Sequence, residues 1–148
     1  PQVLLDLSRF TSESDRVIAN IYGNVKLMDG LNFRTTFGID NMTIINKTFQ
    51  NPLHGDGVAN NGNAINTNQS YRRWNLTNVL NYNKSFGDHN IAALVGNEQQ
   101  YTWQEGWGAW RQGVTDPFYN EFQGGFNTIV PSGNFLGENY LVSFFGRV

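Results

Sequence analysis

The chain has 148 residues, a formal net charge of −2, no cysteine and 14% aromatic residues. The near-neutral charge argues against nucleic acid as a partner, and the missing cysteines exclude disulfides and thiolate metal sites. No stretch approaches the unbroken apolar run of a membrane helix, although barrel strands alternate and hide their apolar residues in an average.

Period-two alternation of apolar and polar residues is the strongest pattern in the chain, and it predicts strands. Residues 1–14 lack a clear period, so we expect a loop or a strand end there. Stretches rich in Asn and Gly interrupt the alternation and predict two long loops, roughly 46–69 and 104–137. The predicted strands cover roughly 15–28, 31–45, 70–84, 89–103 and 138–148.

The first two strands form a hairpin whose register can be tested. A three-residue loop, Met28 to Gly30, puts Leu27 opposite Leu31 and keeps both faces matched along the hairpin. Such loops often end with a residue in the left-handed region, and Gly30 stands at that place.

The next two strands form a second hairpin. Pairing Tyr82 with Ile91 leaves residues 85–88 as the turn and keeps Glu98 on the polar face. Asn78 then stands as an exception on the apolar face, and Val79 and Leu94 are exceptions on the polar one.

Aromatic residues mark both ends of the third strand. Trp74 and Tyr82 are eight residues apart on one face, about 26 Å along an extended chain or about 20 Å after a barrel-like tilt. An apolar band with an aromatic girdle at each edge is typical of an outer-membrane barrel wall, and an ordinary soluble sheet explains this stretch equally well. Outer-membrane barrels also alternate short periplasmic turns with long extracellular loops, as this chain does.

These patterns predict an all-β protein. Its antiparallel up-and-down strands would form part of a large transmembrane outer-membrane β-barrel, and the abrupt end on an apolar strand suggests a fragment. The lipid-facing candidates are Val17, Ile21, Val25, Phe33, Phe37, Trp74, Leu76, Leu80, Tyr82 and Ile91. The lumen-facing candidates are Asn20, Asn24, Arg34, Asn75, Asn81 and Glu98.

Three stretches together resemble one family. They read NVKLMDGLNFRTTFGID from Asn24, WNLTNVLNYNKSFGDHNIAALVGNE from Trp74, and ENYLVSFFGRV from Glu138. In this order and spacing they resemble the SusC/RagA family of TonB-linked outer-membrane transporters. The predicted loops carry no match, as expected of segments that set substrate choice.

The resemblance implies a plugged barrel of the 22-stranded type in the bacterial outer membrane. Such proteins import glycans, peptides or similar nutrients beneath a SusD-like surface lipoprotein, with energy from TonB pulling on a plug. The implied partners are therefore the rest of the barrel and its plug, the lipoprotein, TonB and the lipid bilayer. This chain shows no plug domain, and no cofactor is expected.

Aromatic residues crowd the second predicted loop and are weak candidates for contact with a substrate or partner: Trp103, Trp107, Trp110, Arg111 and Tyr119. The less specific explanation, which we favour, is an interfacial girdle with loop packing. No pair of carboxylates has a fixed separation, and no serine has a triad context, so an enzyme is not expected. The contrasting class is a soluble β-sandwich that binds carbohydrate, which requires the chain to bury its own apolar face.

Overall fold

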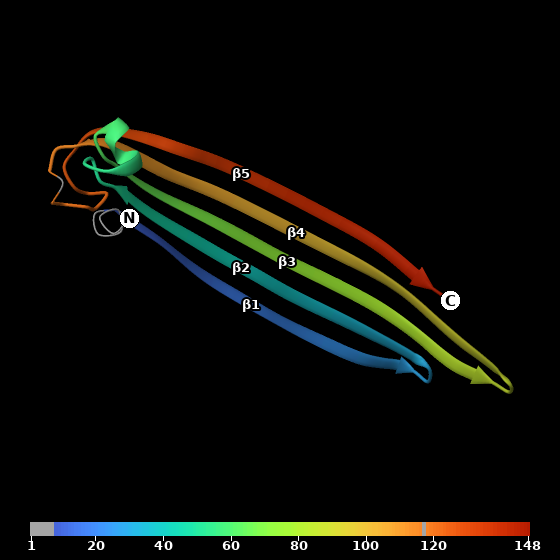
Figure 1. Ribbon diagram of the computed structural model, residues 1–148. Coiled ribbons are helices and arrows are strands. Elements are labelled where there is room, and N and C mark those ends of the chain that lie inside the picture. Colours follow the sequence, from blue (N-terminus) through green and yellow to red (C-terminus); the bar gives the residue numbers. More distant parts are fainter. Residues whose placement is uncertain (1–7, 117) are drawn as a thin grey trace. The chain divides into compact units, whose positions relative to one another are not determined.

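The computed structural model describes residues 8–116 and 118–148, and these residues form one antiparallel sheet. The five strands lie side by side in sequence order (Figure 1). A short 3-10 helix, η1, joins the second and third strands. The elements are β1 (Arg9–Met28), β2 (Leu31–Gln50), η1 (Gly55–Asn60), β3 (Asn63–Phe86), β4 (His89–Val114) and β5 (Phe126–Arg147).

The strands are longer than the sequence predicts. The predicted loops 46–69 and 104–137 are wrong over most of their length, because many of their residues lie in β2 to β5. The long connections between the strands are residues 51–62 and 115–125. For residues 1–14, where the sequence predicts a loop or a strand end, the strand end is found from Arg9 onward, and residues 1–7 lie outside the described part of the chain. Asn, Gln and Gly are poor strand formers alone, but neighbouring strands supply backbone partners that override this preference.

Cross-strand side-chain bonds hold the polar ends of β2 and β3 in register. Asn46 Nδ2 donates to Thr67 Oγ1 over 3.3 Å, and Asn63 Nδ2 donates to Gln50 Oε1 over 2.5 Å. These amides therefore bond across the ladder and tie side chains of the two strands together.

The first hairpin matches the predicted register. Gly30 has φ +81°, the left-handed conformation expected at the end of the turn. A Cβ placed on Gly23 would lie 3.7 Å from Cγ2 of Thr35, its predicted opposite residue. The carbonyl of Gly30 also accepts a hydrogen bond from the Asn83 amide over 2.7 Å, which joins this turn to β3.

The predicted register of the second hairpin is wrong by two residues. Ser85 Oγ lies 3.1 Å from Asn90 Oδ1, and the rings of Trp74 and Tyr101 stack at 6.1 Å between centroids, so Tyr82 falls opposite Ala93. The cause is a tighter turn, in which Gly87 has φ +59° and β4 begins at His89. A shift of two residues leaves every side chain on its predicted face.

The described residues divide into two compact units, and the strands run through both. The first unit contains residues 8–15, Met42–Ser70 and Gln104–Leu136, and the second contains Arg16–Asn41, Tyr71–Trp103 and Gly137–Val148. Among the described residues, the buried hydrophobic side chains belong to the first unit, where Phe122 and Phe126 pack against Phe49, Ala64 and Val114.

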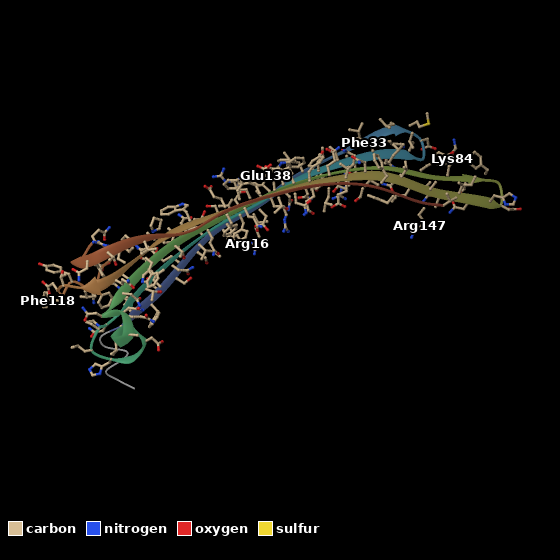
Figure 2. The ribbon with its side chains drawn as sticks, turned by 90° about the horizontal axis from the view of Figure 1, so that it is seen from above. Arg16, Phe33, Lys84, Phe118, Glu138 and Arg147 are labelled. Atoms are coloured by element: carbon tan, nitrogen blue, oxygen red, sulfur yellow. The ribbon has the colours of Figure 1, made fainter. Side chains whose placement is uncertain are left out.

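The second unit leaves its apolar face uncovered. Within the described residues it buries no large hydrophobic side chain, and Val17, Ile21 and Val25 are 60%, 70% and 54% exposed. Figure 2 shows Phe33 on one side of this sheet and Arg16 on the other. A single sheet with an open apolar face contradicts the β-sandwich alternative, which required a core closed within the chain. No helix among the described residues is long and apolar enough to cross a membrane.

Candidate functional site

The polar face of the second unit carries a groove of about 590 Å3. Its lining brings together four of the six lumen-facing candidates, Asn20, Arg34, Asn75 and Glu98, from four adjacent strands. Asn24 and Asn81 share this face by alternation but lie outside the groove lining.

An ion pair and a cation–π contact lie on the same polar face. Arg16 forms a bidentate ion pair with Asp40, with nitrogen–oxygen distances of 2.8 and 2.7 Å. The Arg34 guanidinium lies 4.8 Å above the centroid of the Tyr22 ring. The sequence interpretation did not single out Arg16 or Tyr22 as site residues. The predicted hairpin register could have found the ion pair, because it places Arg16 two positions from Asp40 across the strands.

Gly38 leaves room for the side chain of Asn75, one of the lumen-facing candidates, to lie against the sheet. A Cβ on Gly38 would lie 2.5 Å from Oδ1 of Asn75, so the amide occupies the space that a side chain would fill. The polar face therefore offers amide, guanidinium and carboxylate groups to whatever meets this side of the sheet.

The opposite face carries an aromatic cluster centred on Trp74. Phe37, Tyr101 and Tyr140 surround it, with ring centroids 6.3, 6.1 and 6.2 Å away. Phe37 and Trp74 are two of the lipid-facing candidates, and the cluster joins four neighbouring strands, β2 to β5. Alternation places the remaining candidates of β1 to β4 on this same face.

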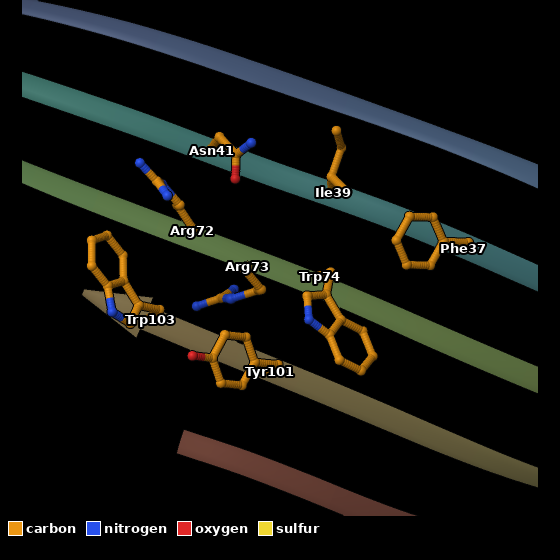
Figure 3. A pocket seen from close by; sticks show the side chains of 8 residues that line it. All are labelled: Phe37, Ile39, Asn41, Arg72, Arg73, Trp74, Tyr101 and Trp103. Carbon is orange, nitrogen blue, oxygen red and sulfur yellow. The ribbon is translucent and has the colours of Figure 1, made fainter. Parts of the chain in front are cut away.

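A second groove, of about 550 Å3, lies beside the cluster on the apolar face. Figure 3 shows the side chains of the eight residues that line it: Phe37, Ile39, Asn41, Arg72, Arg73, Trp74, Tyr101 and Trp103. Arg73 also lines the groove of the polar face, where alternation along β3 places its side chain. The guanidinium carbon of Arg72 lies 4.8 Å above the Trp103 ring centroid. Sequence reasoning missed Arg72, since its role depends on which residue of β4 stands opposite.

The aromatic residues proposed for the second loop do not form one site. Trp103, Trp107, Trp110 and Arg111 lie on β4, and only Tyr119 lies in the connection that follows it. The loop placement was wrong because β4 continues to Val114. Trp103 belongs to the groove beside Trp74, and the Tyr119 ring meets Phe118 edge to face at 5.9 Å.

Arg111 has a structural role in the first unit. It lies 5.6 and 5.0 Å from the ring centroids of Phe122 and Phe126 and donates to the Phe122 carbonyl over 2.7 Å. Arg9 of β1 holds the same connection, with a 2.6 Å ion pair to Glu121. The connection 115–125 is thus attached to the edge strand β1 through Arg9 and to β4, next to the other edge strand, through Arg111.

Comparisons with known proteins agree with this geometry. No family model matches the chain. TonB-dependent receptor P3 from Formosa agariphila is 37% identical over 152 residues, covering all of this chain and 15% of the relative. The fold matches the structure of the RagAB peptide transporter with a TM-score of 0.79 and 21% identity, over 95% of this chain and 16% of that one. The RagAB peptide importer in its open-open state matches with a TM-score of 0.74 and 21% identity, with the same coverage.

A single antiparallel sheet with one polar and one uncovered apolar face, matching these structures, is part of the wall of an outer-membrane β-barrel. The chain is similar to a TonB-dependent receptor in sequence and to the RagAB transporter in fold, and it corresponds to a segment of the barrel. It spans about 15% of the length of the curated relative.

Proposed function

We propose that this chain forms part of a transporter in the bacterial outer membrane that imports glycans, peptides or similar nutrients. TonB supplies the energy through a plug, and a SusD-like surface lipoprotein is the partner outside. Support comes from the TonB-dependent receptor to which the chain is 37% identical and from the fold shared with the RagAB peptide transporter.

The observation that carries this proposal is the unequal character of the two faces. The polar face gathers Asn20, Arg34, Asn75 and Glu98 around one groove, whereas Val17, Ile21 and Val25 remain exposed on the other. A wall between water and lipid needs this division, because a lipid-facing Lys or Arg at mid-depth costs about 2–4 kcal/mol.

In the complete barrel, the edge strands of this sheet pair with further strands, and its connections lie on opposite sides of the membrane. β1 and β5 are the edge strands, and the remaining strands of the barrel pair with them. The two short turns, after β1 and after β3, lie in the periplasm, and the connections 51–62 and 115–125 lie at the cell surface beneath the lipoprotein. The polar face then borders the plug.

Paired cysteine variants test the placement of the faces. The chain contains no cysteine of its own, so Asn20→Cys and Ile21→Cys can be compared in the complete protein after any cysteines elsewhere have been replaced. In intact outer membranes a water-soluble maleimide should label the Asn20→Cys variant and spare the Ile21→Cys variant. Labelling of the Asn20→Cys variant should be the same after extraction into detergent. Equal labelling of both variants in intact membranes would contradict the wall.

Growth experiments test the transport activity. A strain that lacks the gene should lose growth on the imported nutrient and keep growth on glucose, and panels of oligosaccharides and of peptides separate the two substrate classes. The lipoprotein should co-purify with the complete protein under mild detergent. Normal growth of the deletion strain on every member of both panels would reject a role in nutrient import.

A further inference from the structure

The groove beside Trp74 has two levels. Trp74 stacks with Tyr101 and Arg72 stacks on Trp103, which places each pair opposite one another on β3 and β4. One level is therefore aromatic, with Phe37 beside it on β2. The other level, two residues further along, carries the Arg72 guanidinium and the Asn41 amide, which both line the groove.

Arg72 brings an uncompensated positive charge to this groove. Its side chain is exposed, and within the described residues it forms no ion pair. Trp103 orients the guanidinium by stacking but leaves its N–H donors available, because a stacked ring contacts only the guanidinium plane. None of the described residues that line the groove is acidic.

The position of the groove along β3 defines its surroundings. Trp74 lies eight residues before Tyr82, so these two rings mark the edges of an apolar band roughly 20 Å tall on a tilted strand. Arg72 lies just beyond Trp74 on the side away from the short turn that ends at His89. At that level hydrocarbon gives way to headgroups, where a cation meets the phosphates of anionic lipids.

We propose that this groove binds a phosphorylated lipid of the outer leaflet. An acyl chain lies against Phe37, Trp74 and Tyr101, and the headgroup phosphate accepts hydrogen bonds from Arg72 and from the Asn41 amide. Guanidinium groups match phosphate oxygens in a bidentate geometry, and aromatic rings provide rigid apolar area for the chain. This inference rests on the proposed outer-membrane placement and adds a lipid site on the outside of the wall.

The test uses the complete protein that contains this chain, purified in mild detergent and stripped of lipid. Bisphosphorylated, acylated lipid A is titrated in, and bound lipid is counted by native mass spectrometry. We expect saturable binding, weakened about tenfold by Arg72→Gln and by removal of the lipid phosphates, as the loss of a charge-assisted hydrogen bond predicts. Trp74→Ala should also weaken binding several-fold by removing the apolar wall of the groove.

Arg34→Gln is the matched control, because it removes the same charge from the opposite face of the sheet. It should leave lipid binding unchanged. Equal binding to wild type and Arg72→Gln would overturn the proposal, as would full displacement of the lipid by millimolar inorganic phosphate, which would identify a free-anion site. Labelling of Ile21→Cys by a water-soluble reagent would instead refute the wall itself, so the two failures are distinguishable.

Discussion

Thr35 and Asn78 hydrogen-bond to each other on the apolar face of the sheet, where the Thr35 hydroxyl donates to Asn78 Oδ1 over 2.8 Å. Asn78 is the polar exception that interrupts the otherwise apolar pattern of β3. Its partner comes from β2, between Phe33 and Phe37. The two polar side chains thus satisfy one another on the face that we propose to meet lipid, where no water would be available to either.

Removing one member of this pair should cost more than removing both. Thr35→Val leaves the Asn78 amide without its donor, and we expect a loss of about 1–2 kcal/mol in the free energy of unfolding. The double variant Thr35→Val/Asn78→Leu should recover most of that loss, because no unpaired polar group remains. Urea unfolding of the complete protein in lipid vesicles measures both, with Thr36→Val on the polar face as control. Strictly additive effects of the two substitutions would show that the bond contributes nothing.

Gly96 should not tolerate a side chain, whereas Gly23 should. A Cβ on Gly96 would overlap the ring of Phe145, which lies across it from β5. We expect Gly96→Ala to destabilise the protein by about 1–3 kcal/mol, as overpacking does. At Gly23 the nearest atom is 3.7 Å away, so Gly23→Ala should be neutral within about 0.5 kcal/mol. Heat-induced unfolding followed by gel mobility compares the two, and a recovery in Gly96→Ala/Phe145→Leu would identify the ring as the cause.

A charge introduced on the apolar face should destabilise the protein more than the same charge introduced on the polar face. Ile21→Lys places an ammonium group on the exposed apolar face, between mid-depth and the edge marked by Trp74, and should destabilise the folded barrel by about 1–3 kcal/mol. Asn20→Lys places the same group in the polar groove and should change stability by less than about 1 kcal/mol. Reversible unfolding in phospholipid vesicles measures both variants. A harmless Ile21→Lys would mean that this face meets water.

The connection 115–125 should depend on Arg111 more than on Arg9. Arg111→Gln removes two cation–π contacts and the bond to the Phe122 carbonyl. We expect at least tenfold faster protease cleavage within 115–125, which corresponds to about 1.4 kcal/mol of local stability. Arg9 and Glu121 are 39% and 54% exposed, so Arg9→Gln should have a small effect that high salt abolishes. Slow cleavage in Arg111→Gln would show that other contacts hold the connection.

The sequence by itself determined the strands near both short turns and the face on which their side chains lie. Alternation is a local property of an extended chain, so it survives even the two-residue error in the register of β3 and β4. It therefore placed Asn20, Arg34, Asn75 and Glu98 on one face, where the structure brings them to one groove.

Only the tertiary structure decided which residues meet. The Thr35–Asn78 bond, the Arg72–Trp103 stack and the Arg9–Glu121 ion pair each depend on register or on the path of a connection between strands. The polar ends of the strands were missed for a related reason. Their Asn-rich sequences read as loops in isolation, and they become strands because hydrogen bonding to neighbouring strands outweighs their weak intrinsic preference.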